Sequence, residues 1–265
     1  MIALELKELE HGVKVGDACP SIKPNVIEDT MFTVNGEPIG FYLKDISIYS
    51  EKAAQLADVA DKELRSNRVP KSVMKRSSGF LDDDKSRQVE QYSTILGSIP
   101  PKPHMRRVYA TRSSVHNVPN AQTFVKAMLM LAKESENIIA SLTPCLYEEQ
   151  KKLISENIAK QWRFGDLFTS SISNFNIAAD FHRDNGNLKG CANVIIAKRK
   201  NSTGGCTTIP DYGATVDSRD NSMLYYPAWR NIHGVTPIIP THDGGYRNTL
   251  VFYPLSNFPR DETNG

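Results

Sequence analysis

The stretch Phe181-His182-Arg183-Asp184 places an imidazole and a carboxylate two residues apart, at the end of a run of strand-forming residues. In a β-strand, residues i and i+2 point to the same face. His182 and Asp184 can therefore offer two ligands to one metal ion, and a third ligand must come from elsewhere in the fold. The turn-forming residues Asn185-Gly186-Asn187 follow directly, which would end the strand and leave the metal accessible.

The third ligand is expected to be His233, in the segment Asn231-Ile-His-Gly-Val at the start of a later predicted strand. Two histidines and one carboxylate form the facial triad of non-haem Fe(II) oxygenases, which leaves one face of the ion open for a chelating co-substrate and O2. By ligand type alone, a catalytic zinc site is the alternative.

The pattern Arg247-x-Thr249 on the next predicted strand favours iron over zinc. A buried guanidinium can bind a terminal carboxylate through two parallel hydrogen bonds, and a neighbouring hydroxyl can add a third. These residues therefore predict a site for an organic acid such as 2-oxoglutarate next to the metal.

Short strand-forming runs separated by turns continue through the second half of the chain, which is typical of a sandwich or jelly-roll barrel. The predicted strands are Thr169–Phe181, Cys191–Ala197, Met223–Tyr226, Ile232–Ile239 and Arg247–Tyr253.

The first half is predicted to begin with a hairpin over residues 32–43, because Asn35-Gly36 suits a tight turn with positive φ. A helix over residues 51–65 with Ser50 as its N-cap follows. Residues 65–112 lose this periodicity and are interpreted as long loops. Two further helices are expected, one from about Pro119 that stops at Pro144 and one over roughly 147–160.

These patterns predict an α+β protein with a jelly-roll core in the C-terminal half and a helix-rich N-terminal half packed on it. Residues 1–118 would supply the hairpin, the first helix and basic loops that could face nucleic acid. Residues 119–265 would supply the support helices and the β-core, and the two parts would form one compact catalytic unit.

The bulk composition is that of an ordinary soluble globular protein, with 40% hydrophobic residues and a formal net charge of +2. The four cysteines include no closely spaced pair, which is consistent with reduced thiols inside a cell. The acidic start does not resemble a signal peptide, and no apolar run approaches the ~20 residues that span a bilayer. The expected protein is soluble and intracellular, cytoplasmic or nuclear, with no membrane contact.

The chain resembles the TET/JBP family of DNA-base dioxygenases over roughly residues 165–255. In that family a polar strand leads into the metal-binding His-x-Asp, a Gly-Gly turn precedes a hydrophobic strand, and His-Gly-x-Thr-Pro carries the distal ligand. The matching segments are Phe175-Asn-Ile-Ala-Ala-Asp-Phe-His-Arg-Asp-Asn-Gly-Asn-Leu-Lys-Gly190, Gly204-Gly205 with Ile209-Pro210, His233-Gly-Val-Thr-Pro237 and Gly245-Tyr-Arg247.

The resemblance implies a double-stranded β-helix that holds Fe(II) through His182, Asp184 and His233. It also implies 2-oxoglutarate anchored by Arg247, with Thr249 nearby, and O2 as the second co-substrate. The implied substrate is the 5-methyl group of a pyrimidine in duplex DNA, with 5-methylcytosine favoured and thymine as the alternative. Because the chain carries no long Cys-rich region like that of animal TET proteins, it looks like a compact member of microbial, viral or lower-eukaryotic type.

Such an enzyme must flip the target base out of the duplex and hold it in the site. Asn174, Asn176 and Trp229 are the candidate base-binding residues, although capping of a turn or core packing would also explain them. Arg106 and Arg107, within the basic segment between Arg65 and Arg112, are the candidate phosphate contacts. A solvated basic surface with no partner is an equally good interpretation of that segment.

Two other functions stay open from the residues alone. A 2-oxoglutarate-dependent hydroxylase of a small metabolite or a protein side chain would need the same metal site but no DNA surface. A non-catalytic jelly-roll binding module would need neither, and the complete ligand set with Arg247 argues against it.

Overall fold

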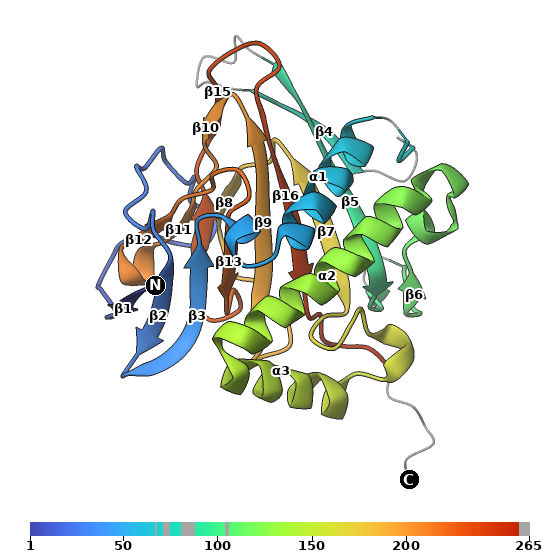
Figure 1. Ribbon diagram of the computed structural model, residues 1–265, viewed down its shortest axis with the longest axis horizontal. Helices are drawn as coiled ribbons and strands as arrows, with labels where there is room; N and C mark the ends of the chain where they lie inside the picture. Colours follow the sequence, from blue (N-terminus) through green and yellow to red (C-terminus); the bar gives the residue numbers. More distant parts are fainter. Residues whose placement is uncertain (67, 71–74, 81–87, 104–105, 260–265) are drawn as a thin grey trace.

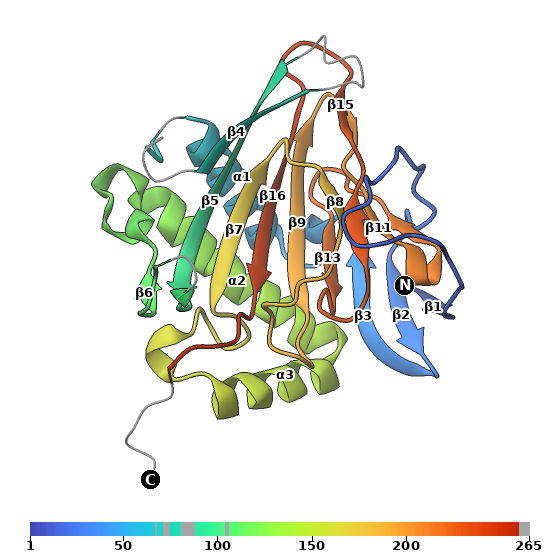
Figure 2. The same cartoon turned by 180° about the vertical axis from the view of Figure 1, so that it is seen from behind.

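Two β-sheets lie face to face, and helices cover the outer face of the larger sheet (Figure 1). The computed structural model describes residues 1–66, 68–70, 75–80, 88–103 and 106–259. Seen from behind, the sheets lie in front of the helices (Figure 2). Within the described ranges the α-helices are α1 (Glu51–Arg65), α2 (Gln122–Leu142) and α3 (Pro144–Asn157).

The larger sheet runs, from one edge to the other, through β1 (Ile2–Glu5), β2 (Thr30–Val34), β3 (Glu37–Leu43), β13 (Met223–Tyr226), β9 (Asn193–Lys200), β16 (Tyr246–Tyr253), β7 (Ser170–Phe175), β5 (Gln88–Ile99) and β4 (Lys75–Phe80). The short strand β6 (Thr111–Arg112) pairs with β5. The smaller sheet has the order β12 (Ala214–Val216), β11 (Thr207–Ile209), β14 (His233–Val235) and β8 (Ala179–His182). A third, two-stranded sheet joins β10 (Ser202–Gly204) to β15 (Ile238–Pro240). Two facing sheets of this kind confirm the predicted jelly-roll core.

The predicted hairpin and first helix are confirmed. Asn35 and Gly36 join β2 to β3 with φ values of 54° and 78°, the left-handed conformation that a tight hairpin turn requires. Ser50 caps α1 by accepting a hydrogen bond from the backbone N–H of Ala53.

Helix α2 buries one apolar face against the larger sheet. Phe124, Met128 and Leu131 are each 0% exposed and belong to the main core cluster. Burial of each such side chain contributes roughly 1.5–3 kcal/mol. None of the helices in the described ranges has the length and apolar character of a membrane-spanning segment.

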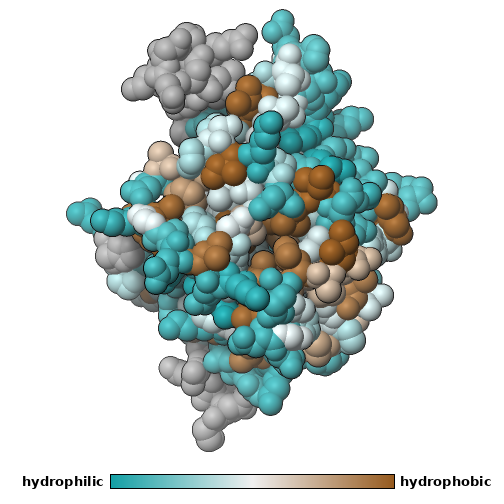
Figure 3. Space-filling view, turned by 90° about the vertical axis from the view of Figure 1, so that its left-hand side faces the viewer, coloured by the Kyte–Doolittle hydropathy of each residue, from teal (hydrophilic) through white to brown (hydrophobic). Residues whose placement is uncertain are grey.

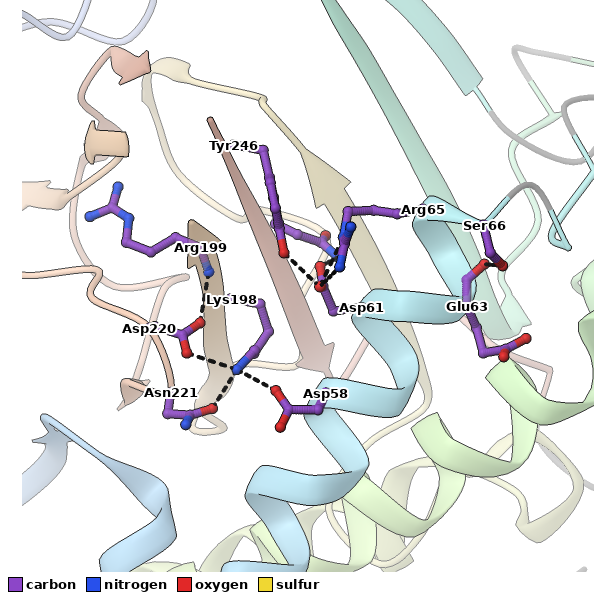
Figure 4. A network of polar contacts seen from close by, with 11 residues as sticks. Asp58, Asp61, Glu63, Arg65, Ser66, Lys198, Arg199, Asp220, Asn221 and Tyr246 are labelled. Carbon is purple, nitrogen blue, oxygen red and sulfur yellow. Dashed lines mark hydrogen bonds and ion pairs between the residues drawn. The ribbon is translucent and has the colours of Figure 1, made fainter. Parts of the chain in front are cut away.

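Polar contacts also join α1 to the larger sheet (Figure 4). Lys198 of β9 lies 2.6 Å from Asp58 of α1 and 3.0 Å from Asp220. Asp61 of α1 accepts hydrogen bonds from the Tyr246 hydroxyl at 2.8 Å and from Asn248 Nδ2 at 3.1 Å, both on β16. These contacts attach α1 to the face of β9 and β16 that is turned toward the helices.

Strand β16 presents two different faces, because side chains alternate along a strand. Leu250 and Phe252 pack into the core beneath the helices. Arg247, Thr249 and Val251 point the other way and line a cavity between the sheets. The centre of the larger sheet therefore serves as the structural core on one side and as the wall of the cavity on the other.

The prediction of a helix-rich N-terminal half is wrong. Among the described residues before Pro119, α1 is the only α-helix, and the strands β1 to β6 all belong to or pair with the larger sheet. Strand β3 pairs with β13, and β5 pairs with β7. The N-terminal residues thus extend both flanks of the sheet that lines the cavity, instead of packing on it as a helical layer.

The loop interpretation of residues 65–112 is wrong where the strands β4, β5 and β6 lie within this segment. Ser93, Thr94 and Ser98 of β5 are buried, and these small hydroxyl side chains hide the apolar alternation by which a strand is usually identified. Residues 71–74 and 81–87 of this predicted loop segment lie outside the described residues.

Two predicted strands are each divided in the structure. Thr169–Phe181 becomes β7 and β8, because Asn176 takes a left-handed φ of 53° between them. Ile232–Ile239 becomes β14 and β15, separated at Thr236-Pro237, where proline cannot donate a ladder hydrogen bond.

Candidate metal and co-substrate site

Two histidines face each other across the smaller sheet. His182 ends β8 and is paired in register with His233, the first residue of β14. Their ring centroids lie 4.3 Å apart. The antiparallel pairing of two strands distant in sequence therefore brings the two imidazoles together.

Backbone carbonyls set the orientation of both imidazoles. His182 Nδ1 lies 2.7 Å from the carbonyl oxygen of Asp180, and His233 Nδ1 lies 3.2 Å from that of Asn231. Because a carbonyl oxygen can only accept, Nδ1 carries the proton and Nε2 keeps its lone pair for a metal. Burial lowers the pKa of His233 despite the opposing effect of Asp184. The lowered pKa favours the neutral ring, which is the form that binds a metal.

Asp184 brings its carboxylate from the turn after β8 and not from the strand itself. Its Oδ1 lies 3.6 Å from His182 Nε2 and 4.0 Å from His233 Nε2. One ligand atom from each of the three residues lies within 4.8 Å of the others, and the described ranges hold no second cluster of this kind. Two imidazoles and a carboxylate that converge on one point fit Fe(II) and leave the remaining positions to small ligands.

Two asparagines that the sequence pattern does not identify as site residues contact Asp184. Asn193 Nδ2 donates to Asp184 Oδ2 at 2.8 Å, and Asn187 Nδ2 lies 3.4 Å from the same oxygen. Asn187 is predicted only as a turn residue. Asn193 starts a strand and is followed by the apolar residues 194–197, and an inward polar residue at that position is the signal that could have identified it.

Arg247 is buried at the opposite end of the cavity, with 2% of its surface exposed. Its Nε donates to Ser218 Oγ at 2.7 Å, and no carboxylate in the described ranges forms an ion pair with it. Burial, with the nearby Arg199, lowers the pKa of Arg247 to about 9. A buried cation that lacks a counter-charge is costly, so this position favours an anionic ligand.

Arg199 places a second guanidinium close to Arg247 but is not among the residues that line the cavity. It is paired in register with Arg247 across β9 and β16, and burial lowers its pKa as well. Its Nη2 donates to the carbonyl oxygen of Gly204 at 2.6 Å. Arg247 lines the cavity, and Arg199 adds positive charge beside it, so this end of the cavity suits the carboxylate of a dianionic acid such as 2-oxoglutarate.

Gly205 makes room for the Arg247 side chain. Its φ is +66°, and a Cβ placed there would lie 2.3 Å from Arg247 Cδ. The backbone conformation and the close approach both require glycine at this position. This explains the second glycine of the Gly204-Gly205 step seen in the sequence.

Thr249 and Asn174 lie opposite each other on β16 and β7 and both line the cavity. The cavity has a volume of about 520 Å³ and extends from Arg247 to the metal-ligand cluster and the exposed turn at Asn185 and Gly186. The structure therefore gathers the three candidate metal ligands, Arg247, Thr249 and Asn174 around one cavity.

The other two candidate base-binding residues do not line this cavity. Asn176 Oδ1 accepts a hydrogen bond from the backbone N–H of Arg247 at 3.0 Å, and the Asn176 N–H donates to the carbonyl oxygen of Arg247 at 2.8 Å. These bonds give Asn176 a structural role at the end of β7. Trp229 is half-buried and follows the cavity residue Ala228 in sequence.

The N-terminal segment before β2 supports the strand that carries His182. The backbone N–H of Gly16 donates to the carbonyl oxygen of Phe181 at 2.8 Å, and the N–H of Phe181 donates to that of Asp17 at 2.9 Å. Cys19 packs so closely on Gly234 that a Cβ added to Gly234 would lie 2.9 Å from Cys19 Cβ.

On the side of the molecule seen in Figure 3, hydrophobic side chains are scattered among hydrophilic ones.

Arg106 and Arg107 lie in a loop away from the cavity lining. Arg106 is exposed, and Arg107 is half-buried and pairs through its backbone with Lys102. Ala110, at the end of this loop, packs against the same small hydrophobic cluster as the cavity residue Leu255. The loop is thus connected to one end of the cavity through this cluster.

The family model Tet_JBP, which describes the oxygenase domain of the 2OGFeDO superfamily, matches residues 98–255, more than half of the chain. No curated protein matches the chain in sequence.

Solved structures also show similarity to the chain. NgTET1 in complex with 5mC DNA has a TM-score of 0.56 at 12% identity, over 92% of this chain and 84% of that chain. A full-length protein from Neurospora crassa in complex with alpha-KG has a TM-score of 0.40 at 12% identity, over 82% and 75% of the two chains. An oxidoreductase of the 2OG-Fe(II) oxygenase family from Burkholderia pseudomallei has a TM-score of 0.43 at 12% identity, over 80% and 94%. At these identities the likeness to NgTET1 shows a shared fold.

Proposed function

Since this chain belongs to the TET/JBP family of the 2-oxoglutarate- and Fe(II)-dependent oxygenases, it is a dioxygenase that uses Fe(II), 2-oxoglutarate and O2, and we propose that it oxidises the 5-methyl group of a pyrimidine in DNA. The favoured base is 5-methylcytosine, and thymine is the alternative.

The family match carries this proposal, because the matched residues include all three candidate metal ligands, Arg247 and Thr249. A shared fold alone would not support a substrate, since one fold serves many chemistries. NgTET1 was solved with 5mC DNA, which makes 5-methylcytosine the first base to test.

In this proposal, His182, Asp184 and His233 hold the iron, and Arg247 binds the distal carboxylate of 2-oxoglutarate with help from Thr249. Bound iron supplies the oxidising chemistry. The chain itself binds and orients the two co-substrates and keeps bulk water away from them. The buried Arg247 and the partly exposed Asp184, at 2% and 32% exposure, suit a cavity that is closed at the carboxylate end and open near the metal.

Asn174 is assigned to the substrate base. Its amide offers both a donor and an acceptor, as the edge of a pyrimidine requires. The side chain lines the cavity and has no hydrogen-bond partner among the described residues. A polar group in this position is available to a base that has been flipped out of the duplex.

Charge reversal of Arg106 and Arg107 together is expected to weaken DNA binding equally for every duplex sequence, because phosphate contacts carry no sequence information. If each arginine contacts one phosphate, the slope of log affinity against log salt should become less steep by about 1.8. Fluorescence anisotropy between 50 and 200 mM salt, roughly the range over which such effects are large, measures both quantities. Lys126→Glu, at an exposed position on α2, is the matched control. Unchanged affinity and slope in the double variant would exclude a role for this loop in DNA binding.

The proposed activity is tested by incubating the full chain with Fe(II), 2-oxoglutarate and duplexes that contain either 5-methylcytosine or only unmodified thymine. Mass spectrometry of the nucleosides then identifies the base that gains oxygen. Succinate formed without an oxidised base would instead favour a hydroxylase of a small metabolite or protein side chain. Absence of both succinate and oxidised base would contradict the proposal.

A further inference from the structure

The two oxygens of the Asp184 carboxylate lie in different environments. Oδ1 faces the two histidines, whereas Oδ2 is occupied by the Asn193 and Asn187 side chains. In the described ranges, no lysine or arginine forms an ion pair with Asp184. The carboxylate is therefore held by neutral donors, which orient it without reducing its negative charge.

Asn193 is fixed more firmly than its single bond to Asp184 suggests. It is 2% exposed, and Asn187, at 6% exposed, donates through Nδ2 to Asn193 Oδ1 at 2.8 Å. An amide side chain has one acceptor end and one donor end. Because Asn187 occupies the acceptor end, only the donor end of Asn193 can face Asp184.

The backbone anchors the same group of residues. The N–H of Asn187 donates to the carbonyl oxygen of Asp184 at 3.0 Å, and the N–H of Asp184 donates to that of Ala228 at 3.3 Å. Asn193 itself is the first residue of β9, in the interior of the larger sheet. The bond from Asn193 to Asp184 therefore links a ligand that lies in a turn to a rigid strand in the opposite sheet.

We propose that Asn193 is a positioning residue for the metal site, which holds Asp184 so that Oδ1 faces the histidines before a metal arrives. The inference rests on the proposed function, because it takes Asp184 as a metal ligand. Asn187 supports it by fixing the orientation of the Asn193 amide. Partners of this kind around metal ligands typically change metal affinity by about 10–100-fold when they are removed.

The test is calorimetric titration of the chelator-treated full chain with Mn(II), which binds oxygen and nitrogen ligands as Fe(II) does but is stable in air. Asn193→Ala and the nearly isosteric Asn193→Leu are expected to bind Mn(II) about 10–100-fold more weakly than the wild type. The leucine variant keeps most of the buried volume, so that loss of the hydrogen bond is separated from loss of packing.

Asn248→Ala is the matched control. Asn248 is also a buried asparagine of the larger sheet that donates Nδ2 to an aspartate, but that aspartate is Asp61 on the helix side. Thermal unfolding of the metal-free proteins should show destabilisation in both asparagine-to-alanine variants. Only the Asn193 variants should lose Mn(II) affinity.

The outcomes separate the inference from the proposed function. Wild-type protein that binds no Mn(II) would overturn both. Wild-type binding with equally tight binding by the Asn193 variants would overturn only the positioning role. An equal loss of affinity in Asn248→Ala would also overturn it, because general destabilisation would then explain the effect.

Discussion

Replacing Asp184 with alanine is expected to reduce 2-oxoglutarate turnover by about 10³-fold or more. A bound metal stabilises the charge of the transition state by several kcal/mol, and each 1.36 kcal/mol changes the rate about tenfold. Asp184 is the only carboxylate in the three-residue cluster, and its loss leaves two neutral imidazoles to hold a divalent cation. Succinate formation and Mn(II) titration measure the rate and the binding separately.

Asp180→Ala is the matched control for this experiment. Asp180 lies two residues before His182 with an exposed side chain, and only its backbone carbonyl contacts the His182 ring. Alanine keeps that carbonyl, so activity should persist. Retained turnover in Asp184→Ala would show that the metal assignment is wrong.

Replacing Arg247 with methionine is expected to weaken 2-oxoglutarate binding by roughly 10²–10³-fold, since removal of one partner of a buried, hydrogen-bonded charge pair costs about 2–5 kcal/mol. The same change should raise the melting temperature of the protein without co-substrate, because it removes a buried cation that forms no ion pair with the described chain. The rise should be about 2–4 °C for each kcal/mol gained.

These opposite effects distinguish an anion-binding arginine from a structural one. Binding is measured by titration of 2-oxoglutarate into the Mn(II) form, and stability by thermal unfolding of the metal-free form. Arg219→Met is the control, because Arg219 is 43% exposed and already has a carboxylate partner, Asp217, at 2.8 Å. Lower stability together with unchanged 2-oxoglutarate affinity in Arg247→Met would contradict the assigned role.

Local patterns predict the local parts of this fold. Ser50 before a helical apolar stripe and Asn35-Gly36 between two strands each depend on neighbouring residues, and the structure has both features. The spacing of His182 and Asp184 likewise predicts that they act together, although Asp184 lies in a turn beyond the end of β8. The short distance along the chain keeps the two side chains close in either conformation.

Non-local pairings could not be predicted in this way. The register that places His233 opposite His182 depends on two strands meeting across the smaller sheet. The same holds for the bonds of Gly16 and Asp17 to Phe181, and for Asn193, which reaches Asp184 from the opposite sheet. Local residue patterns do not reveal such contacts, because each contact exists only in the complete fold.

The position of β16 has a consequence for how the protein is made. This strand comes last among the described strands, yet it lies at the centre of the larger sheet between β9 and β7. Until the ribosome has released it, β9 and β7 each expose an unpaired edge, which is a site for wrong pairing between chains. Arg247 also arrives only with this strand, so neither the sheet nor the proposed 2-oxoglutarate site can form during earlier synthesis. We therefore expect slow folding governed by long-range contacts, with newly made chains at greatest risk of aggregation just before β16 inserts.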